Sequence, residues 1–309
     1  MTRDLLQEAY GAMRYDLQKT VLTMLGMAWG IATVVLLLAY GQGFGQAIHA
    51  YVEAYGIKQI GILPGRTSEQ AGGSKAGKQV RLTEDDIELI RNIAPLVRYI
   101  SRFSDMSVMV NAGDRSYSLR VQGFDPSMAK IGSLKIVEGR FINDEDNASH
   151  AHVAVLGFES KQRLFSGMPA IGEDIHIKGV SFAVIGVLQP HIQEGGNDDQ
   201  NRVIVIPYEA GDAFRDNYYL DGIWLNTGEL EHFRLVTDLR NALAAAHGFL
   251  PSDQRAVFIV DVQEWETQLR ILVDSLKILL GFIGVLTLGI GGVGLMNIML
   301  VSVAQRTAR

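Results

Sequence analysis

The stretch ILLGFIGVLTLGIGGVGLMNIMLVSVAQ, residues 278–305, contains no Asp, Glu, Lys, Arg or His. Fifteen of its residues are Val, Ile, Leu or Phe, and it is longer than the roughly 20 apolar residues that cross a bilayer as a helix. Gly289, Gly291 and Gly294 have the GxGxxG spacing of dinucleotide-binding loops. That motif needs a preceding strand and a later acidic residue, and neither is visible. We therefore predict a membrane helix.

A second uncharged stretch lies near the start of the chain. No residue between Lys19 and His49 is charged, and VLTMLGMAWGIATVVLLLAYG at 21–41 carries nine Val, Leu or Ile residues. Such residues favour insertion into the bilayer. The ending LLLAYG resembles a signal-peptidase site, but the apolar run exceeds the about 7 to 15 residues of a signal-peptide core. We predict a membrane anchor at residues 20–48, which includes the first residues above the membrane.

Both apolar stretches carry small residues at helical spacing. Gly26 and Gly30 form a GxxxG pair in the first stretch, and Gly284, Gly291 and Gly294 share one face of the second. Small residues let a second helix backbone approach closely. We predict that these five glycines form helix contacts within or between protomers. The alternative is that glycine is simply frequent in membrane helices.

Composition limits the class of protein. Of 309 residues, 48% are hydrophobic and 20% charged, and the net charge is −6, which argues against a nucleic-acid partner. The chain has no cysteine, which excludes disulfides, Cys-ligated zinc and thiol chemistry. Residues 51–274 are polar enough to form one or two folded soluble domains.

The positions of Lys and Arg predict the orientation in the membrane. Arg3, Arg14 and Lys19 precede the first span, whereas the twenty residues after the apolar run that ends at Gly41 contain only Lys58. Because cytoplasmic flanks carry the excess of Lys and Arg, we predict a cytoplasmic N-terminus and a large loop outside the cell interior. Residues 1–19 have an apolar helical face and read as a cytoplasmic interfacial helix, with a solvated lead-in as the alternative.

Strand patterns outnumber helix patterns between the spans. The stretch 97–125 alternates around NAGD and predicts a hairpin, as does 174–188 around Lys178 and Gly179. Thr83 and Asp86 form a near capping box before the helical pattern EDDIELIRNI. We expect an α+β domain with two parts. Residues 49–130 and 217–262 form a βαβ-like part, and residues 131–216 form an inserted β-rich part.

The segment before the second span predicts a stalk. VQEWETQLRILVDSLKILLGFIGV has no helix breaker between Val262 and Gly281. We therefore expect one helix that runs from the outer domain into the membrane, with residues 263–277 as a stalk of ~20 Å at ~1.5 Å per residue. Its apolar residues Trp265, Leu269, Leu272 and Leu276 would belong to a rigid lever.

Three patterns could carry chemistry, and each has a simpler interpretation. Gly72, Gly77 and Lys78 match part of a P-loop, but Gln79 stands where magnesium binding needs a Ser or Thr hydroxyl. DEDNASHAH at 144–152 and GGNDDQ at 195–200 contain metal-ligand types, yet both are typical of solvated loops. A nucleophile elbow and a Ser, His and acid set are not visible. We predict no catalytic, cofactor-binding or metal-binding residues.

Five stretches resemble the MacB/FtsX-like permeases of ABC transporters, and the resemblance runs from about residue 5 to the end. They are LQKTVLTMLGMAWGIATVVLLLAYGQG (17–43), LKIVEGRFINDED (134–146), HVAVLGFESKQRLF (152–165), IGEDIHIKGVSFAVIGVL (171–188) and GIGGVGLMNIMLVSVAQRTAR (289–309). The last stretch is the most specific. In that family the periplasmic core is split into a porter-like βαβ part and an inserted β-rich part.

The resemblance implies a permease that does not thread its substrate through its own membrane helices. A cytoplasmic ABC ATPase would bind ATP and magnesium, and this chain would need no cofactor. The stalks of a homodimer, or of a dimer with a related permease, would relay ATP-driven motion to the periplasmic domains, which is termed mechanotransmission. Members of the family serve efflux with a periplasmic adaptor and a TolC-like outer-membrane channel, lipoprotein release, or control of cell-wall hydrolases. The resemblance implies a bacterial inner membrane.

The chain departs from the family in two ways. The fused ATPase of MacB is missing before the first span, so we expect a separate ATPase subunit. The family has four membrane helices, whereas this chain ends at Arg309, where residues 306–309 would begin the cytoplasmic coupling region; we expect a longer natural protein. The alternative functions are a two-helix sensor with an extracytoplasmic ligand-binding domain, and a membrane-anchored hydrolase that lacks a visible catalytic set.

Overall fold

The structure, a computed structural model, describes residues 17–55, 58–70, 76–190, 200–214, 218–228 and 232–307. The chain divides into two compact units, the domain Ala50–Glu266 and a helical unit formed by the segments that precede and follow it. Most of the expected interfacial helix at 1–19 lies outside the described residues, and so do residues 195–199 of the GGNDDQ stretch.

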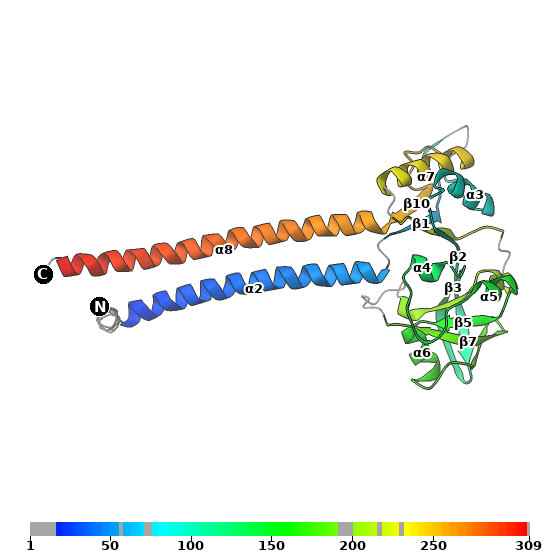
Figure 1. Ribbon diagram of the computed structural model, residues 1–309, viewed down its shortest axis with the longest axis horizontal. Helices are drawn as coiled ribbons and strands as arrows, with labels where there is room; N and C mark the ends of the chain where they lie inside the picture. The colour runs from blue at the N-terminus through cyan, green and yellow to red at the C-terminus, as the bar shows by residue number, and fades with distance from the viewer. Residues whose placement is uncertain are drawn as a thin grey trace. The chain divides into compact units, whose positions relative to one another are not determined.

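Two long helices form the helical unit (Figure 1). Helix α2 spans Leu17–Tyr55 and helix α8 spans Val262–Thr307. Neither contains proline, so no residue in them lacks a helical N–H donor. Glycine costs ~1 kcal/mol relative to alanine inside a helix, yet α8 is continuous. The predicted helix from Val262 into the second apolar stretch is confirmed.

The domain consists of strands and shorter helices. In chain order they are β1 (Gln59–Pro64), α3 (Glu84–Ile93), β2 (Tyr99–Ala112), β3 (Arg115–Phe124), α4 (Met128–Ile131), β4 (Ile136–Gly139), α5 (Asp144–Ala148), β5 (Val153–Leu156), α6 (Phe158–Phe165), β6 (Asp174–Ile177), β7 (Val180–Leu188), η1 (Gln200–Arg202), β8 (Val203–Pro207), η2 (Glu209–Ala213), β9 (Gly222–Asn226), α7 (His232–His247) and β10 (Val257–Asp261). The predicted α+β class is confirmed.

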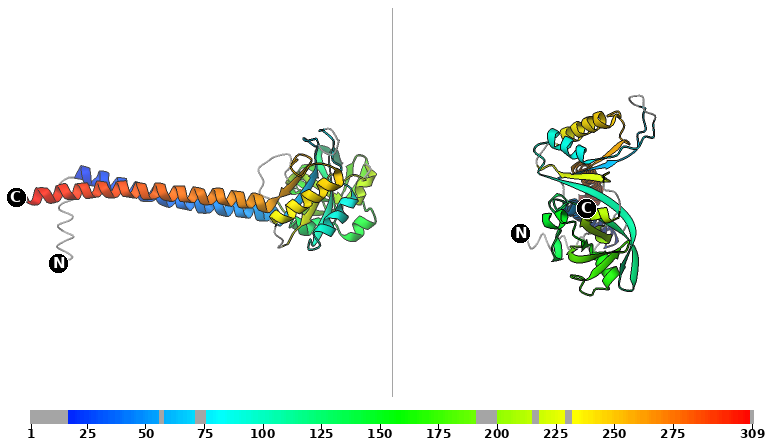
Figure 2. Two further views of the ribbon diagram at one scale, coloured as in Figure 1. Left: turned by 90° about the horizontal axis from the view of Figure 1, so that it is seen from above. Right: turned by 90° about the vertical axis from the view of Figure 1, so that its right-hand side faces the viewer.

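One half of the domain repeats the order strand, helix, strand. The units β1–α3–β2 and β9–α7–β10 form an antiparallel sheet in the order β10–β1–β9–β2. This is the split βαβ arrangement of ferredoxin-like folds. Ile90 of α3 and Leu239 and Leu243 of α7 pack with Ile60 and Ile62 of β1, and all five are fully buried. Because both helices contribute to the same core, they cover one face of the sheet (Figure 2).

The other half is a closed ring of strands. β3 pairs with β8, β8 with β5, β5 with β7 and β7 with β6, and β6 returns to β2 where Val110 pairs with Ile177. As in small barrels, apolar side chains from the ring strands fill its interior. β2 and β3 supply Val110 and Val121 to this core. The long hairpin of β2 and β3 therefore contributes to both halves, and the boundaries 131–216 of the inserted part stay a prediction.

A third apolar cluster lies where the two halves meet. Phe103 of β2 and Phe124 of β3 stack with ring centroids 5.1 Å apart. They pack with Met128 and Ile131 of the short helix α4 and with Val205 of β8. The halves are thus joined by a shared core as well as by the continuous strands β2 and β3.

Local signals in the sequence correspond to local structure. The Asp86 carboxylate accepts a hydrogen bond of 2.8 Å from the N–H of Thr83, at the start of α3. The β2–β3 hairpin turns at NAGD, where Gly113 has φ +54°. The β6–β7 hairpin turns at Lys178 and Gly179, with φ +48° and +86°. Both predicted hairpins and the predicted helix start are confirmed.

The stretch DEDNASHAH is not the solvated loop that we expected. Its first five residues form α5, because Asn143 and Asp146 cap the helix reciprocally at 2.8 and 2.9 Å. Asp146 is buried, and both its carboxylate oxygens bind Arg140, at 2.5 and 2.9 Å. The hydrogen bond from Arg140 lowers the pKa of Asp146, although partial burial acts in the opposite direction. The capping pair Asn143 and Asp146 therefore explains why this acidic run begins with a helix.

Candidate functional site

Close approach of α2 to α8 defines the helical unit. A methyl group added at Gly45 would lie 3.4 Å from Val273 Cγ1. Towards the other end of the pair, a methyl group at Gly30 would lie 3.3 Å from Thr287 Cγ2. As the residue number falls along α2 it rises along α8, so the helices are antiparallel.

The contact residues of α8 repeat with a regular period. Val273, Lys277, Leu280, Gly284 and Thr287 are the residues that face glycines or Val34 of α2. Their separations alternate between four and three, which is the spacing of a coiled-coil seam. We call these five residues the α8 seam. A methyl group at Gly284 would lie 3.1 Å from Val34 Cγ2, so the helices meet too closely there for a larger side chain.

The predicted glycines do not all lie at this seam. Gly30 is buried against Thr287, and Gly284 lies against Val34. Gly26 has nothing within 4 Å of an added methyl group. Gly291 is half-buried, and Gly294 lies in α8 but its surroundings are outside the described residues. The structure therefore brings Gly30 and Gly284 to one contact surface, whereas α8 does not approach Gly26.

Two glycines of the contact surface were not predicted from the sequence. Gly41 lies 3.5 Å from Lys277 Cγ and 3.7 Å from Leu280 Cδ1, and Gly45 lies against Val273, all measured from an added methyl group. Gly41 and Gly45 form a second GxxxG pair, which begins at the last residue of the apolar run. This signal could have been found by extending the small-residue pattern past the membrane span.

The stalk residues follow the same seam only in part. Leu269 and Leu276 are half-buried, but Leu272 is 57% exposed and its neighbour Val273 is 4% exposed. The side chain of Trp265 lies outside the described residues. Ile271, Leu272 and Val273 are consecutive apolar residues, so periodicity alone did not distinguish the face that packs from the face that does not.

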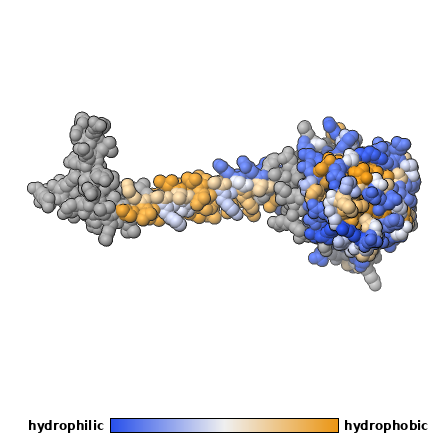
Figure 3. All heavy atoms as spheres, turned by 90° about the horizontal axis from the view of Figure 1, so that it is seen from below, coloured by the Kyte–Doolittle hydropathy of each residue, from blue (hydrophilic) through white to orange (hydrophobic). Residues whose placement is uncertain are grey.

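Apolar side chains are exposed along the middle of the helical unit (Figure 3). Trp29 on α2 is 76% exposed, and Ile278 and Ile290 on α8 are each 75% exposed. Met24–Ala47 and Val262–Val293 are long and apolar enough to cross a membrane. Water contact with such faces would cost ~25 cal/mol per Å² of apolar surface, whereas acyl chains impose no such cost.

The domain has an open polar pocket of about 420 Å³ between α3, β2 and α5. Its wall includes Arg102, whose guanidinium lies 2.7 Å from Asp125, 2.7 Å from Glu209 and 2.9 Å from Glu84. The ring of Tyr208 lies 4.3 Å from the guanidinium carbon. Burial alone would lower the pKa of Arg102, but the bonds to Asp125 and Glu209 raise it. The arginine neutralises an acidic wall.

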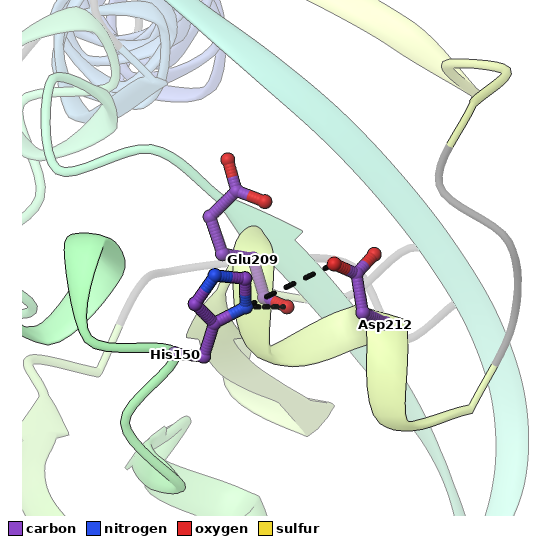
Figure 4. Close-up of side chains that lie close together, drawn as sticks. All are labelled: His150, Glu209 and Asp212. Atoms are coloured by element: carbon purple, nitrogen blue, oxygen red, sulfur yellow. Dashed lines mark hydrogen bonds and ion pairs between the residues drawn. The ribbon is translucent and has the colours of Figure 1, made fainter.

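One group of side chains has the composition of a metal site. Ligand atoms of His150, Glu209 and Asp212 lie within 4.8 Å of one another (Figure 4). His150 Nδ1 is 3.2 Å from the main-chain oxygen of Glu209 and 3.8 Å from Asp212 Oδ2. The Glu209 carboxylate binds the Arg102 guanidinium, whose charge opposes a cation. We therefore assign no metal to this group.

The two nucleotide-like motifs lie in the wrong structural contexts. Gly289 and Gly291 lie inside α8, with no strand before them and no helix start at them. Lys78 Nζ lies 3.4 Å from the main-chain oxygen of His247, and the next helix begins only at Glu84. Gly72 lies outside the described residues. Neither place offers the helix N-terminus that cradles phosphate groups.

Comparison with known proteins identifies a family and several relatives that this chain resembles. The family model of the MacB-like periplasmic core domain matches residues 20–235. The macrolide export ATP-binding/permease protein MacB of Wolinella succinogenes is 29% identical over 304 residues, which cover 98% of this chain and 46% of that protein. The pyoverdine export ATP-binding/permease protein PvdT of Pseudomonas putida is 31% identical over 311 residues, covering 98% and 45%. The chain spans about half the length of these relatives.

Two solved structures share the fold. The periplasmic region of MacB from Actinobacillus actinomycetemcomitans matches with a TM-score of 0.57 and 17% identity, over 72% of this chain and 98% of that one. The extracellular domain of the noncanonic ABC-type transporter YknZ from Gram-positive bacteria matches with a TM-score of 0.52 and 15% identity, over 65% and 99%. Since the family model covers residues 20–235 of the 309, this chain belongs to the MacB-like periplasmic core domain family of ABC transporter permeases.

Proposed function

We propose that this chain is the permease part of an ABC transporter that relays ATP-driven motion to its periplasmic domain. The observation that carries the proposal is the helix α8, which begins directly after β10 of the domain and continues through the second apolar stretch. A continuous helix transmits displacement along its axis without a hinge. The protein would act as a homodimer, or as a dimer with a related permease, and would export a substrate or extract it from the periplasm or membrane.

ATP and magnesium would bind a separate cytoplasmic ABC ATPase. Two observations support this assignment. The relatives named above carry both ATP-binding and permease in their names, so an ATP-binding part accompanies the permease part in those proteins. The nucleotide-like motifs of the described residues lie in contexts that do not bind phosphate.

The bacterial inner membrane would hold the helices, with the N-terminus in the cytoplasm and the domain in the periplasm. Arg3, Arg14 and Lys19 before the first span support this orientation. Relatives named for macrolide and pyoverdine export support an efflux role. A periplasmic adaptor and a TolC-like outer-membrane channel would then complete the route out of the cell.

A pair of insertions after Glu266 tests the relay. Seven Gly and Ser residues should break the helix, whereas seven helix-forming residues should extend α8 by about two turns and shift its face by only ~20°. In the complex with its ATPase, the flexible insertion should abolish ATP-dependent transport and leave ATP hydrolysis, while the helical insertion retains both. Transport that survives the flexible insertion would contradict the relay.

The glycines of α8 provide a second test. Replacing Gly291 and Gly294 with leucine should abolish ATP-coupled transport and leave the domain folded, because large side chains would block close helix contacts. Circular dichroism and limited proteolysis would check the fold. Unchanged transport by the double variant would refute the packing role of these two residues.

A further inference from the structure

A chain of buried polar groups lies at the end of the sheet where α8 begins. Asp261 is the last residue of β10, and its Oδ1 accepts a hydrogen bond of 3.0 Å from the N–H of Gln263 in the first turn of α8. The same oxygen lies 2.8 Å from Nδ1 of His232, at the start of α7. The second ring nitrogen, Nε2, lies 2.5 Å from the hydroxyl of Thr227.

The contacts continue to the strand that follows α2. The main-chain N–H of Thr227 donates to the carbonyl oxygen of Lys58 at 3.0 Å, and its hydroxyl lies 3.2 Å from that oxygen. Lys58 precedes β1, and α2 ends at Tyr55. The polar chain therefore connects the segment by which the backbone enters the domain with the residue from which α8 leaves it.

Stability alone is a poor explanation for this polar chain. Thr227, His232 and Asp261 are 1%, 7% and 8% exposed, and removing an ionised carboxylate from water costs several kcal/mol. Buried pairs of this kind are often replaceable by apolar residues without loss of stability. Such pairs do, however, constrain the relative orientation of the segments that carry them, because each hydrogen bond requires a defined distance and angle.

Catalysis does not explain the arrangement either. The order acid, histidine, hydroxyl resembles the triads of hydrolases. The nucleophile of a triad must reach a substrate carbonyl, but the hydroxyl of Thr227 is buried against the carbonyl oxygen of Lys58. An attacking group needs an open approach that this hydroxyl lacks.

We propose that His232 and Asp261 are positioning residues that lock the first turn of α8 to α7 and the sheet. Apolar side chains can slide past one another, whereas the Asp261 carboxylate holds Gln263 and His232 from a single oxygen. Motion of α8 would then turn the ferredoxin-like half of the domain instead of bending the junction. The inference rests on the proposed function, in which α8 carries ATP-driven motion.

Four variants separate this role from simple helix capping. Asp261→Ser keeps a good N-cap for α8 but is too short to hold His232. Asp261→Asn keeps an acceptor for both partners. His232→Asn removes the ring that joins Asp261 to Thr227. His247→Asn is the matched control, because His247 Nε2 makes an equivalent 2.8 Å contact with Asp86 at the other end of α7.

The main experiment uses the full chain assembled with its ATPase in a lipid nanodisc. An environment-sensitive dye on Arg91→Cys labels the exposed surface of α3, since the chain has no other cysteine. Asp261→Ser and His232→Asn should reduce the ATP-dependent fluorescence change by about fivefold or more, with ATP hydrolysis retained. Asp261→Asn and His247→Asn should retain the change. A full response from Asp261→Ser would overturn the lock.

Hydrogen exchange distinguishes failure of the lock from failure of the relay. In the full chain without ATPase, Asp261→Ser should speed amide exchange at Val262 to Glu266 by about tenfold, and His247→Asn should leave it unchanged. Equal exchange rates in wild type and Asp261→Ser would overturn the lock. A second outcome would overturn the relay and leave the lock in place. In it, the wild-type protein shows no ATP-dependent fluorescence change, but Asp261→Ser still exchanges faster than wild type at Val262 to Glu266.

Discussion

Buried charges decide much of the local order in the domain. Arg102 joins β2 to the loop after β3 through Asp125 and to η2 through Glu209. Asp253 performs a similar task for the loop that follows β1. Its carboxylate accepts hydrogen bonds from the Ser68 N–H at 2.6 Å and from the Glu69 N–H at 3.0 Å. Single substitutions at these residues therefore test how much one charged side chain that contacts several segments contributes to the free energy of unfolding.

Arg102→Met should lower the free energy of unfolding by ~2–4 kcal/mol. The change removes the shared partner of Asp125 and Glu209, and an uncompensated, partly buried carboxylate is strongly unfavourable. Urea unfolding of the full chain in detergent would measure the loss. Arg91→Met, on the exposed rim of the same pocket, is the control and should change stability by less than ~0.5 kcal/mol. Equal effects of the two substitutions would show that Arg102 has no special role.

Asp253 should make stability depend on pH in the acid range. Burial would raise the pKa of Asp253, but the hydrogen bonds from Ser68, Glu69 and Arg255 lower it to about 2. The folded-state pKa thus lies below the unfolded value of ~3.9. The stabilisation is therefore complete above the unfolded pKa and is lost as the pH falls through about 2.

The Asp253→Asn variant checks this sign. At neutral pH it should be less stable than wild type by ~1–3 kcal/mol, because it loses an ionised acceptor of several hydrogen bonds. Unfolding curves from pH 7 to pH 2 should show this difference shrinking below pH ~4. Asp114→Asn, in the exposed turn of the β2–β3 hairpin, controls for charge removal. A difference that stays constant down to pH 2 would contradict the assignment.

At the scale of elements, the pairing of α2 with α8 is the feature that most needs a test. The chain has no native cysteine, so introduced cysteines report on single contacts. Gly30→Cys with Thr287→Cys should form an intramolecular disulfide on mild oxidation, because the two positions are in contact. Gly26→Cys with Thr287→Cys should not, since Gly26 has nothing within 4 Å. The shift in gel mobility would measure cross-linking, and equal yields would contradict the specific contact between Gly30 and Thr287.

A leucine scan of neighbouring glycines tests the tightness of the same contact. Gly284→Leu should reduce the yield of the 30–287 disulfide several-fold, because an added carbon already lies 3.1 Å from Val34. Gly281→Leu introduces the same side chain one turn earlier, where nothing lies within 4 Å, and should leave the yield unchanged. A similar loss in both variants would indicate a general effect on the helix and not a packing contact.

At the scale of the whole molecule, the orientation across the membrane is the property on which the proposed function depends. Asp114→Cys, on the exposed β2–β3 turn, should react with a membrane-impermeant maleimide in intact spheroplasts. Thr2→Cys should react only after lysis, because Lys and Arg flank the first span on the cytoplasmic side. The reverse labelling pattern would place the domain in the cytoplasm and contradict the proposal.

The sequence determined the features that depend on neighbouring residues. The two apolar helices, the turns at NAGD and at Lys178 and Gly179, and the helix start at Thr83 all follow from local periodicity or backbone preference. Such signals act over a few residues and need no knowledge of the fold. For the same reason the resemblance to MacB/FtsX-like permeases could be recognised from short stretches.

Only the tertiary structure decided which distant residues meet. Closure of the ring through Val110 and Ile177, the choice of Val273 over Leu272 at the seam, and the contact of His232 with Asp261 join residues with no local pattern in common. The acidic run at 144–148 is helical because Asp146 accepts hydrogen bonds from Arg140 and from the N–H of Asn143. Burial and hydrogen-bond satisfaction are properties of the packed molecule, so single-sequence periodicity does not encode them.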